Sequence, residues 1–482
     1  MQKETVVLFP IAAMSHLTPM VELGKLLLQH GLSVNIPITQ FPFFDNARAD
    51  AYISRVSAAH PSISFHRLPP LPPLPSPSQP KTPTFFFDLL RHAVSLLRDY
   101  LRSLPSVQAL VVDFFLDGAG QVAAELNLRH YFLLPISAST IVASLYLPIL
   151  HNVSTASFKD LGDTPVHFPG LPFPIPASDM PDRVADRSSE TYEALLLQFE
   201  RIARSDGILV NTFPKLEPQS LRALADGLCT PGRALPPVYC VGPITNKGNI
   251  ALRHQSLSWL DGQPNGSVVF LCFGSAGVFS EAQITEIATG LERSGQKFLW
   301  VVKKPPEQGK GWMDAAATMT EPDLEELLPQ GFLDRTADRG MVVKSWAPQV
   351  EVLEHEAVGG FVTHCGWNSV LESIVAGVAM IAWPLYAEQK MNKEFLVKAA
   401  GLAVEMMGYK DEVVVAAEVE EKVRWLMESE GGKELRERAL AVVESARAAM
   451  QERDSAQGSM VELVRSLRSA ADGGRRPGSI DI

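Results

Sequence analysis

Runs of apolar residues alternate with segments of helical spacing along the first half of the chain. The runs that resemble strands are residues 5–11, 32–39, 109–115 and 207–212. After the first run, residues 15–31 place apolar side chains at helical spacing and end at Gly31, a typical helix stop. Continuous apolar strands separated by helices predict an α/β fold with a parallel sheet covered on both faces.

The same pattern restarts after a segment rich in Pro, Gly and Asn at residues 236–265, which is typical of a linker. A length of 482 residues fits two domains, because single cores rarely exceed about 250–300 residues. The predicted organisation is a first domain over residues 1–240, a linker over 241–258 and a second domain over 259–458. Residues 459–482 are expected to form one amphipathic helix and a tail.

Composition narrows the class of protein. The formal charge of −11 argues against nucleic-acid binding. The four cysteines have no C-x-x-C spacing and are expected to be reduced thiols. No uncharged apolar stretch reaches about 18 residues, and the N-terminal run lacks the features of a secretory signal. We therefore expect a cytoplasmic monomer without a membrane span, in which the proline-rich residues 69–83 form an exposed loop.

Residues 361–377, FVTHCGWNSVLESIVAG, read as a strand, a tight turn and a helix. Ser369 and Glu372 have the spacing of a capping box, in which each side chain bonds the backbone N–H of the other. That interpretation does not explain His364 at the end of the strand. In open α/β sheets ligands bind at that end, and a helix N-terminus there offers N–H groups to a phosphate. The segment therefore indicates an anion site, whereas the pair His364 and Cys365 lacks the further ligands that zinc requires.

Residues 346–389, WAPQVEVLEHEAVGGFVTHCGWNSVLESIVAGVAMIAWPLYAEQ, resemble the plant secondary-product glycosyltransferase box of family 1 UDP-glycosyltransferases. The segments FGS at 273–275, VGP at 241–243 and VVDFF at 111–115 follow the order of that family, so the resemblance covers essentially the whole chain. It implies the GT-B fold, in which two Rossmann-like doubly wound domains face each other and a C-terminal helix crosses back to the first.

The resemblance also implies a UDP-sugar donor and a role for each matching residue. Trp346 would stack on the uracil, with Ala347 and Gln349 beside the base and ribose. The diphosphate would meet a helix N-terminus with the side chains Ser275, His364, Asn368 and Ser369. Glu372 would accept from the ribose hydroxyls, which competes with its capping-box role. The sugar would contact Trp367, Glu388, Gln389 and, from the first domain, Ser137. In this family, a Gln at the last position of the box, here Gln389, usually goes with glucose as the transferred sugar.

The acceptor needs activation, because a phenol of pKa about 10 is a poor nucleophile at neutral pH. A histidine general base is therefore expected, with a carboxylate to fix its tautomer. His16 follows the first strand and Asp113 ends a later one, so both lie at the carboxyl edge of one sheet. The resemblance implies that they form the catalytic dyad, although Ser15 stands where the family commonly has Gly. The alternative is that Asp113 only caps the next helix.

This dyad predicts an inverting single displacement without a metal or other cofactor, and no Asp-x-Asp motif occurs in the chain. Apolar loops of the first domain are expected to form most of the acceptor pocket, with candidate residues Phe85, Phe114 and Phe115, and Leu385 of the second domain is a further candidate. Such a pocket favours a flat phenolic or flavonoid-type acceptor. O-glucosylation with UDP-glucose is predicted. C-glucosylation of a phloroglucinol-type ring and a non-catalytic UDP-sugar-binding protein are the alternatives.

Residues 118–123, GAGQVA, match the dinucleotide-binding fingerprint G-x-G-x-x-A after a strand. The acidic residue expected about 20 positions further on is missing. The glycines are therefore interpreted as sites of close helix packing, and a nicotinamide cofactor is not expected.

Overall fold

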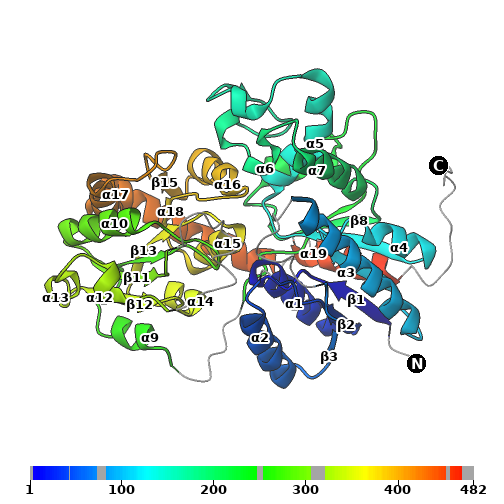
Figure 1. Cartoon of the computed structure of the whole chain (residues 1–482), viewed down its shortest axis with the longest axis horizontal. Coiled ribbons are helices and arrows are strands. Elements are labelled where there is room, and N and C mark those ends of the chain that lie inside the picture. The colour runs from blue at the N-terminus through cyan, green and yellow to red at the C-terminus, as the bar shows by residue number, and fades with distance from the viewer. Residues whose placement is uncertain are drawn as a thin grey trace.

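The computed structural model describes residues 4–42, 44–72, 83–246, 253–305, 321–451 and 456–468. Two lobes lie side by side, each built on a parallel sheet flanked by helices (Figure 1). Most of the proline-rich stretch 69–83 and the tail beyond residue 468 fall outside the described residues.

The sheet of the first lobe has, among the described residues, the strand order β3-β2-β1-β4-β5-β8-β9, and all neighbours pair in parallel. Its strands are β1 (Thr5–Phe9), β2 (Ser33–Ile38), β3 (Ile63–Arg67), β4 (Ala109–Asp113), β5 (Arg129–Leu134), β8 (Gly207–Val210) and β9 (Val238–Cys240). The helices of this lobe are α1 (Met14–Gln29), α2 (Asn46–Ala59), α3 (Pro83–Ser103), α4 (Ala119–Glu125), α5 (Ala138–Val153), α6 (Asp182–Ala185), α7 (Glu190–Ile202) and α8 (Pro218–Ala225). A small hairpin, β6 (Pro165–Val166) with β7 (Ile175–Pro176), and the short helices η1 (Phe158–Asp160) and η2 (Ala177–Asp179) complete it.

Both faces of this sheet are buried, as the continuous apolar runs predict. Val7 and Phe9 of β1 pack in one cluster with residues of α3, α5 and α7. Val6 and Leu8 point to the opposite face and pack with residues of α1 and α2. Successive side chains of a strand alternate between its faces, so a strand covered on both sides must be apolar throughout.

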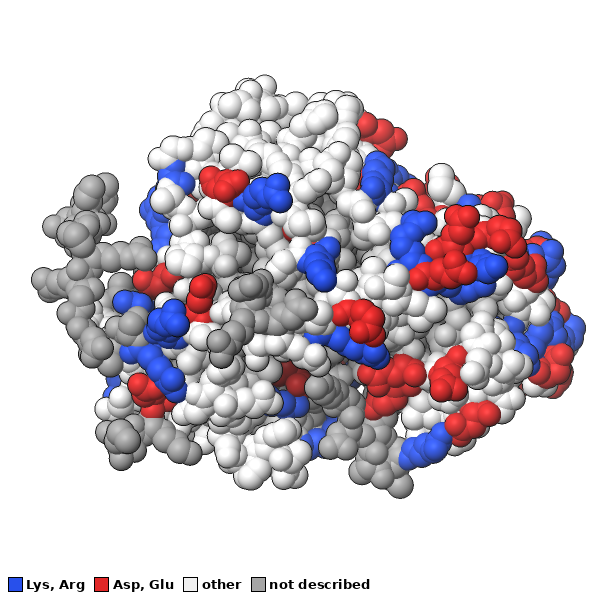
Figure 2. Space-filling view, turned by 180° about the vertical axis from the view of Figure 1, so that it is seen from behind, with Lys and Arg blue, Asp and Glu red and all other residues white. Residues whose placement is uncertain are grey.

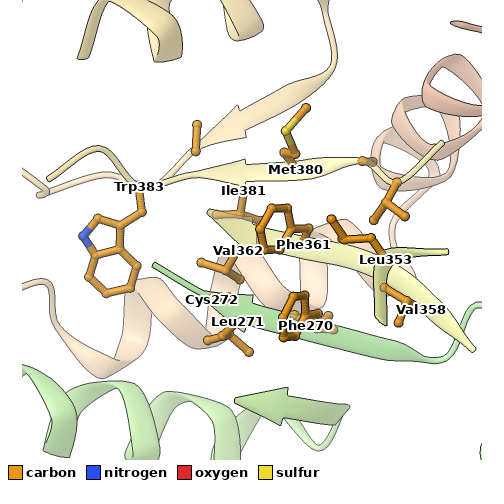
Figure 3. Close-up of a cluster of buried hydrophobic side chains, with 14 of the residues drawn as sticks. Phe270, Leu271, Cys272, Leu353, Val358, Phe361, Val362, Met380, Ile381 and Trp383 are labelled. Carbon is orange, nitrogen blue, oxygen red and sulfur yellow. The ribbon is translucent and has the colours of Figure 1, made fainter. Parts of the chain in front are cut away.

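The second lobe repeats this architecture with the strand order β12-β11-β10-β13-β14-β15 among the described residues. Its strands are β10 (Val268–Cys272), β11 (Lys297–Val302), β12 (Gly340–Lys344), β13 (Val358–Thr363), β14 (Met380–Ala382) and β15 (Ala403–Glu405). Its helices are α9 (Gln255–Leu260), α10 (Glu281–Ser294), α12 (Leu324–Leu327), α13 (Phe332–Arg335), α14 (Gln349–Leu353), α15 (Trp367–Ala376), α16 (Gln389–Phe395), η3 (Leu396–Ala400), α17 (Ala416–Glu428) and α18 (Glu430–Ala449). Figure 3 shows its central strands, where Phe270 and Phe361 stack with ring centroids 5.3 Å apart.

The strand order reverses once in each sheet, next to the first strand of each lobe. In the first sheet this point lies between β1 and β4, and in the second it lies between β10 and β13. The loops that leave adjacent strands in opposite directions open a crevice at such a point, where ligands of α/β proteins bind. His16 and Asp113 lie at the first reversal, and Ser275 and His364 lie at the second.

The chain returns to the first lobe at its C-terminal end. Helix α18 is followed by α19 (Ala456–Arg468), which lies against the first sheet (Figure 1). Leu463 and Leu467 of α19 are buried in the cluster that contains Val6 and Leu8. At its end, Arg468 Nε donates to Glu4 Oε2 at 2.8 Å. The helix thus joins the two lobes a second time, as the resemblance implied.

Two further expectations concern the surface and the thiols. All four cysteines are free and buried. On the face in Figure 2, acidic and basic side chains are intermixed, and no extended basic patch stands out among the described residues in that view. None of the helices in the described ranges has the length and apolarity needed to cross a membrane.

The GAGQVA segment forms the start of α4 and supports helix packing. A Cβ atom added at Gly120 would lie 2.9 Å from Nε2 of His130, closer than normal contact allows. Gly120 therefore allows α4 to approach β5, whereas a Cβ atom at Gly118 would make only ordinary contacts with Val94, at 3.8 Å.

Candidate active site

A cavity of about 2070 Å³ lies between the two lobes and is lined by residues from both. It contains most of the residues that the sequence singled out. The predicted residues that line it are His16, Phe114, Phe115, Ser275, Trp346, Ala347, Gln349, His364, Trp367, Asn368, Ser369, Glu372, Glu388 and Gln389. Residues separated by more than 350 positions in the sequence thus share one cavity.

His16 and Asp113 are in direct contact. Helix α1 begins at Met14, so His16 lies in its first turn, and the end of β4 positions Asp113 behind it. His16 Nδ1 and Asp113 Oδ2 are 2.6 Å apart, and the second oxygen of Asp113 accepts from the backbone N–H of Phe115 at 3.0 Å. Helix α4 has Gly118 as its N-cap, so Asp113 does not cap that helix. A carboxylate that accepts from Nδ1–H leaves Nε2 as the basic nitrogen of the neutral ring.

The surroundings of His16 favour a base. Its side chain is 16% exposed and that of Asp113 is 2% exposed. Burial lowers the pKa of His16, but the charge and hydrogen bond of Asp113 outweigh it, so the pKa is raised above its usual value of 6.5. The rings of Phe114 and Phe115 lie 5.8 and 5.6 Å from the imidazole and form an apolar wall beside it. An aromatic molecule packed against this wall would lie beside the imidazole.

His364 lies across the cavity at the end of β13. Its ring fits between two glycines, because a Cβ atom at either Gly274 or Gly366 would lie 2.4 Å from its Nε2. Burial, together with the nearby Lys303 cation, lowers the pKa of His364 to about 3. The imidazole is therefore neutral at physiological pH and can donate one hydrogen bond, but it cannot supply a positive charge.

Helix α15 presents its N-terminus to the cavity. Its N-cap is Gly366 and no side chain caps it, so the capping-box interpretation of Ser369 and Glu372 is wrong. Among the described residues, His364 Nδ1 and Asn368 Oδ1 are buried without a hydrogen-bond partner. Buried polar atoms are nearly always paired, so these two atoms indicate a polar ligand at the helix end. The uncapped backbone N–H groups and the helix dipole favour an anionic one.

Backbone strain is concentrated around this cavity. Four residues other than glycine have positive φ in the described part of the chain, and three of them adjoin predicted site residues. Ser345 at φ 61° precedes Trp346, Cys365 at φ 63° follows His364, and Ala387 at φ 55° precedes Glu388. The left-handed region is unfavourable for residues with a side chain, and such strain tends to be kept where it positions functional groups.

The end of the cavity at which the nucleotide is expected has an exposed tryptophan and a half-buried carboxylate. Trp346 is 40% exposed, which is unusual for a ring of this size. Gln349 Nε2 donates to Glu372 Oε2 at 2.6 Å and to Ser369 Oγ at 2.8 Å. Burial raises the pKa of Glu372 to about 7, although the bond from Gln349 opposes the shift. A flat ring beside hydrogen-bonding oxygens is suited to a nucleoside.

Two residues expected at the sugar, Gln389 and Trp367, already form hydrogen bonds within the protein. Gln389 Oε1 accepts from the backbone N–H groups of Leu385 and Tyr386, both at 2.9 Å. The indole of Trp367 is 1% exposed, and its Nε1 donates to the carbonyl of Asn211 in the first lobe at 2.7 Å. Trp367 thus borders the cavity while its ring joins the lobes.

Four predicted residues do not line the cavity, and one of them, Asp113, lies behind His16. Ser137 is buried at the N-cap of α5, where it accepts from Thr140 N and donates to Asn392 of the second lobe. Phe86 lines the cavity instead of Phe85, because successive residues of helix α3 point about 100° apart. Leu385 packs against the core of the second lobe.

Three basic residues near the cavity were missed by the sequence reasoning. Arg48 of α2 lies with its guanidinium 5.9 Å from the ring centroid of Trp346. Arg183 of α6 stacks over Phe115 at 5.7 Å. Lys303 donates to the carbonyl of Gly274, and burial lowers its pKa to about 8. They belong to no short motif, so only the docking of the lobes reveals them.

The lobes are held together by polar contacts beside the cavity. Asn368 Nδ2 donates to the carbonyl of Ser15 at 2.8 Å, next to His16. Asp179 of the first lobe is fully buried and pairs with Lys393 at 2.9 Å and Lys410 at 2.7 Å. Within the described ranges, no group of three or more His, Cys, Asp or Glu side chains is arranged to hold a metal ion.

Two parallel sheets that face a shared cavity, and a C-terminal helix that returns to the first lobe, define the GT-B class of proteins. Comparisons with known proteins agree. Residues 219–434 match the family described as UDP-glucoronosyl and UDP-glucosyl transferase. UDP-glycosyltransferase 88F3 of Pyrus communis is 46% identical, with 96% of this chain and 99% of the relative covered. Phloretin 2'-O-glucosyltransferase of Malus domestica is 45% identical with the same coverage.

Solved structures give the same result. A UDP-glucosyltransferase from Polygonum tinctorium capable of glucosylating indoxyl is 36% identical, with a TM-score of 0.85 over 97% of this chain and 99% of that protein. UGT71G1 of Medicago truncatula, complexed with UDP-glucose, is 31% identical, with a TM-score of 0.83 over 97% and 99% of the two chains. The chain belongs to the UDP-glycosyltransferase family and is a glycosyltransferase.

Proposed function

We propose that the protein transfers glucose from UDP-glucose to a hydroxyl group of a phenolic, flavonoid-type acceptor, with inversion and with His16 as general base. The observation that carries this proposal is the 2.6 Å contact between His16 and Asp113 at the wall of the cavity. A base at that position serves a hydroxyl acceptor, since a neutral phenol reacts slowly at physiological pH.

The choice of acceptor rests on the rings around His16 and on the relatives. Phe86, Phe114 and Phe115 present apolar surface to the cavity, which suits a flat aromatic molecule. The names of similar proteins include glucosyltransferases for phloretin and for anthocyanidin, both of which are plant phenolics.

In the proposed reaction, the acceptor hydroxyl gives its proton to Nε2 of His16 while its oxygen attacks the anomeric carbon of glucose. The bond from that carbon to the UDP oxygen breaks, and UDP departs with the electron pair. Asp113 stabilises the imidazolium that forms. The N-terminus of α15, with His364 and Ser275, offers hydrogen bonds to the leaving diphosphate. Because the attack occurs opposite the leaving group, the configuration at the anomeric carbon inverts.

We further propose that these groups stabilise the leaving diphosphate without a metal ion or other cofactor, and that the protein acts as a cytoplasmic monomer. Transfer rates with EDTA and with added Mg²⁺ or Mn²⁺ test the first point. Equal rates support the proposal, whereas loss of transfer in EDTA that Mg²⁺ restores would contradict it.

A screen of UDP-sugars against a panel of phenols tests the function as a whole. The expected result is UDP release that depends on the acceptor and is fastest with UDP-glucose, together with a product whose sugar is lost readily on fragmentation. A fragmentation-resistant product would show C-glucosylation instead. No acceptor-dependent UDP release from a protein that binds UDP would indicate a non-catalytic binder.

A further inference from the structure

Arg48 belongs to the first lobe but contacts the nucleotide end of the second. It lies in the first turn of α2, where its backbone N–H is held by the side chain of the N-cap residue Asp45 at 3.0 Å. Its guanidinium lies over the ring of Trp346, with Cζ 5.9 Å from the ring centroid. Both residues line the cavity.

Trp346 lines the cavity and is unusually exposed for a tryptophan of this lobe. It is 40% exposed, whereas Trp367 and Trp383 of the same lobe are 1% and 2% exposed. His254 makes a T-shaped contact with the ring, at an interplanar angle of 86°. The face of Trp346 is therefore a flat surface on which a base can stack, and Arg48 is the side chain above it.

The spacing fits a planar guest after a small movement. A ring between two flat groups needs about 3.5 Å on each side, or about 7 Å in all. The observed 5.9 Å is about 1 Å short of this. An arginine side chain has several rotatable bonds, so Arg48 can lift by this amount without a movement of α2.

We propose that Arg48 is a nucleotide-binding residue, and that its guanidinium stacks on the face of the uracil opposite Trp346. This inference rests on the proposed use of a UDP-sugar donor. Arginine suits the position because its flat cation stacks on bases, which a lysine ammonium cannot do. The consequence is that the base touches both lobes, so donor binding stabilises the closed arrangement around the acceptor.

Two other roles for Arg48 are testable alternatives. The residue could pack on Trp346 only to hold the lobes together, or it could reach the diphosphate. A purely structural role predicts a loss of thermal stability without a specific loss of nucleotide affinity. A diphosphate contact predicts a loss that grows with the number of phosphates, because it is electrostatic.

Calorimetric titration of uridine, UMP and UDP into the full-length protein separates these roles. Arg48→Ala should weaken binding of all three ligands by a similar factor, about 3- to 30-fold. Arg48→Lys should recover only part of the loss. Arg222→Ala is the control, because it removes the same charge from an exposed position of the first lobe that does not line the cavity, and less than a twofold change is expected.

A double-mutant cycle adds a second test. If Arg48 and Trp346 hold the same base, the Arg48→Ala change should cost much less affinity in a Trp346→Ala background than in the wild type. Unchanged affinity of Arg48→Ala for uridine, or a loss seen only with UDP, would overturn the inference. Failure of the wild type itself to bind any uridine nucleotide would instead refute the proposed donor.

Discussion

His16 and His364 each lie at the strand-order reversal of their own lobe, one after β1 and the other after β13, and have opposite environments. The carboxylate of Asp113 contacts His16 and more than offsets the effect of burial, so the pKa of His16 is raised. His364 is buried near Lys303, none of the described carboxylates pairs with it, and its pKa is lowered to about 3. The same side chain is therefore suited to act as a base in one lobe and as a neutral hydrogen-bond donor in the other.

This difference shows that the environment, more than the residue type or its position in the sheet, sets the chemical role of a histidine. It also divides the proposed reaction between the lobes. The first lobe removes a proton from the acceptor, and the second holds the leaving group with backbone N–H groups and neutral donors. Each of the following predictions changes one side of this comparison.

The largest effect is expected from His16→Ala. Loss of a general base should lower kcat for a phenolic acceptor by about 10²- to 10⁴-fold, because proton removal then depends on water. The dissociation constant for UDP, measured by calorimetry, should change less than twofold, since His16 lies in the first lobe and the proposed diphosphate site lies in the second. If the variant loses UDP affinity but keeps its turnover, His16 serves donor binding and is not the base.

Asp113→Asn should have the next largest effect. The amide is similar in shape but cannot stabilise the imidazolium, and it can favour the wrong tautomer of His16. We expect kcat to fall by roughly 10²-fold, with thermal stability retained as measured by circular dichroism. Near-normal turnover in a folded Asn variant would mean that the carboxylate is not needed.

His364→Ala should affect donor binding instead. A hydrogen bond to a charged group contributes about 1.5–3 kcal/mol, so UDP affinity should fall about 10- to 100-fold. His364→Asn retains a donor and should recover part of this loss in the same titration. If both variants bind UDP as tightly as the wild type, His364 does not contact the diphosphate.

The pH dependence is the subtlest test. His16 must be neutral to act as a base, so kcat/KM should rise as pH increases through its raised pKa, above 6.5. Removing the charge of Asp113 should move this rise to lower pH in the Asn variant. The pair should also stabilise the fold below pH 6.5, with the contribution lost as pH rises through the folded-state pKa. A rise at the same pH in both proteins would exclude the pair as the titrating group.

Much of the fold could be predicted because its signals are local. The apolar runs at β1, β4 and β10 and the helical spacing of α1 are visible without knowledge of distant contacts. The juxtaposition of His16 and Asp113 followed from their positions at the carboxyl ends of strands in one sheet, together with the family resemblance. When a motif residue lies on a short connection directly after a buried strand, the strand determines its position in space.

Contacts between the lobes could not be predicted in this way. Arg48 and Trp346 meet only because the lobes dock, and no short-range pattern records that contact. Ser137 was expected at the sugar, but its hydroxyl is used by the cap of α5 and by Asn392 from the opposite lobe. The choice of Phe85 over Phe86 failed because one residue of helix rotation decides which ring faces the cavity.

The most direct test of His16 as the base is to vary the acidity of the acceptor. The ratio of kcat/KM between the wild type and His16→Ala should be measured at one pH for phenols of similar size, with pKa values from about 10 to below 7. The account predicts a large ratio for the weakly acidic phenols and a ratio approaching one for those that are already ionised. A ratio that stays constant across the series would contradict it.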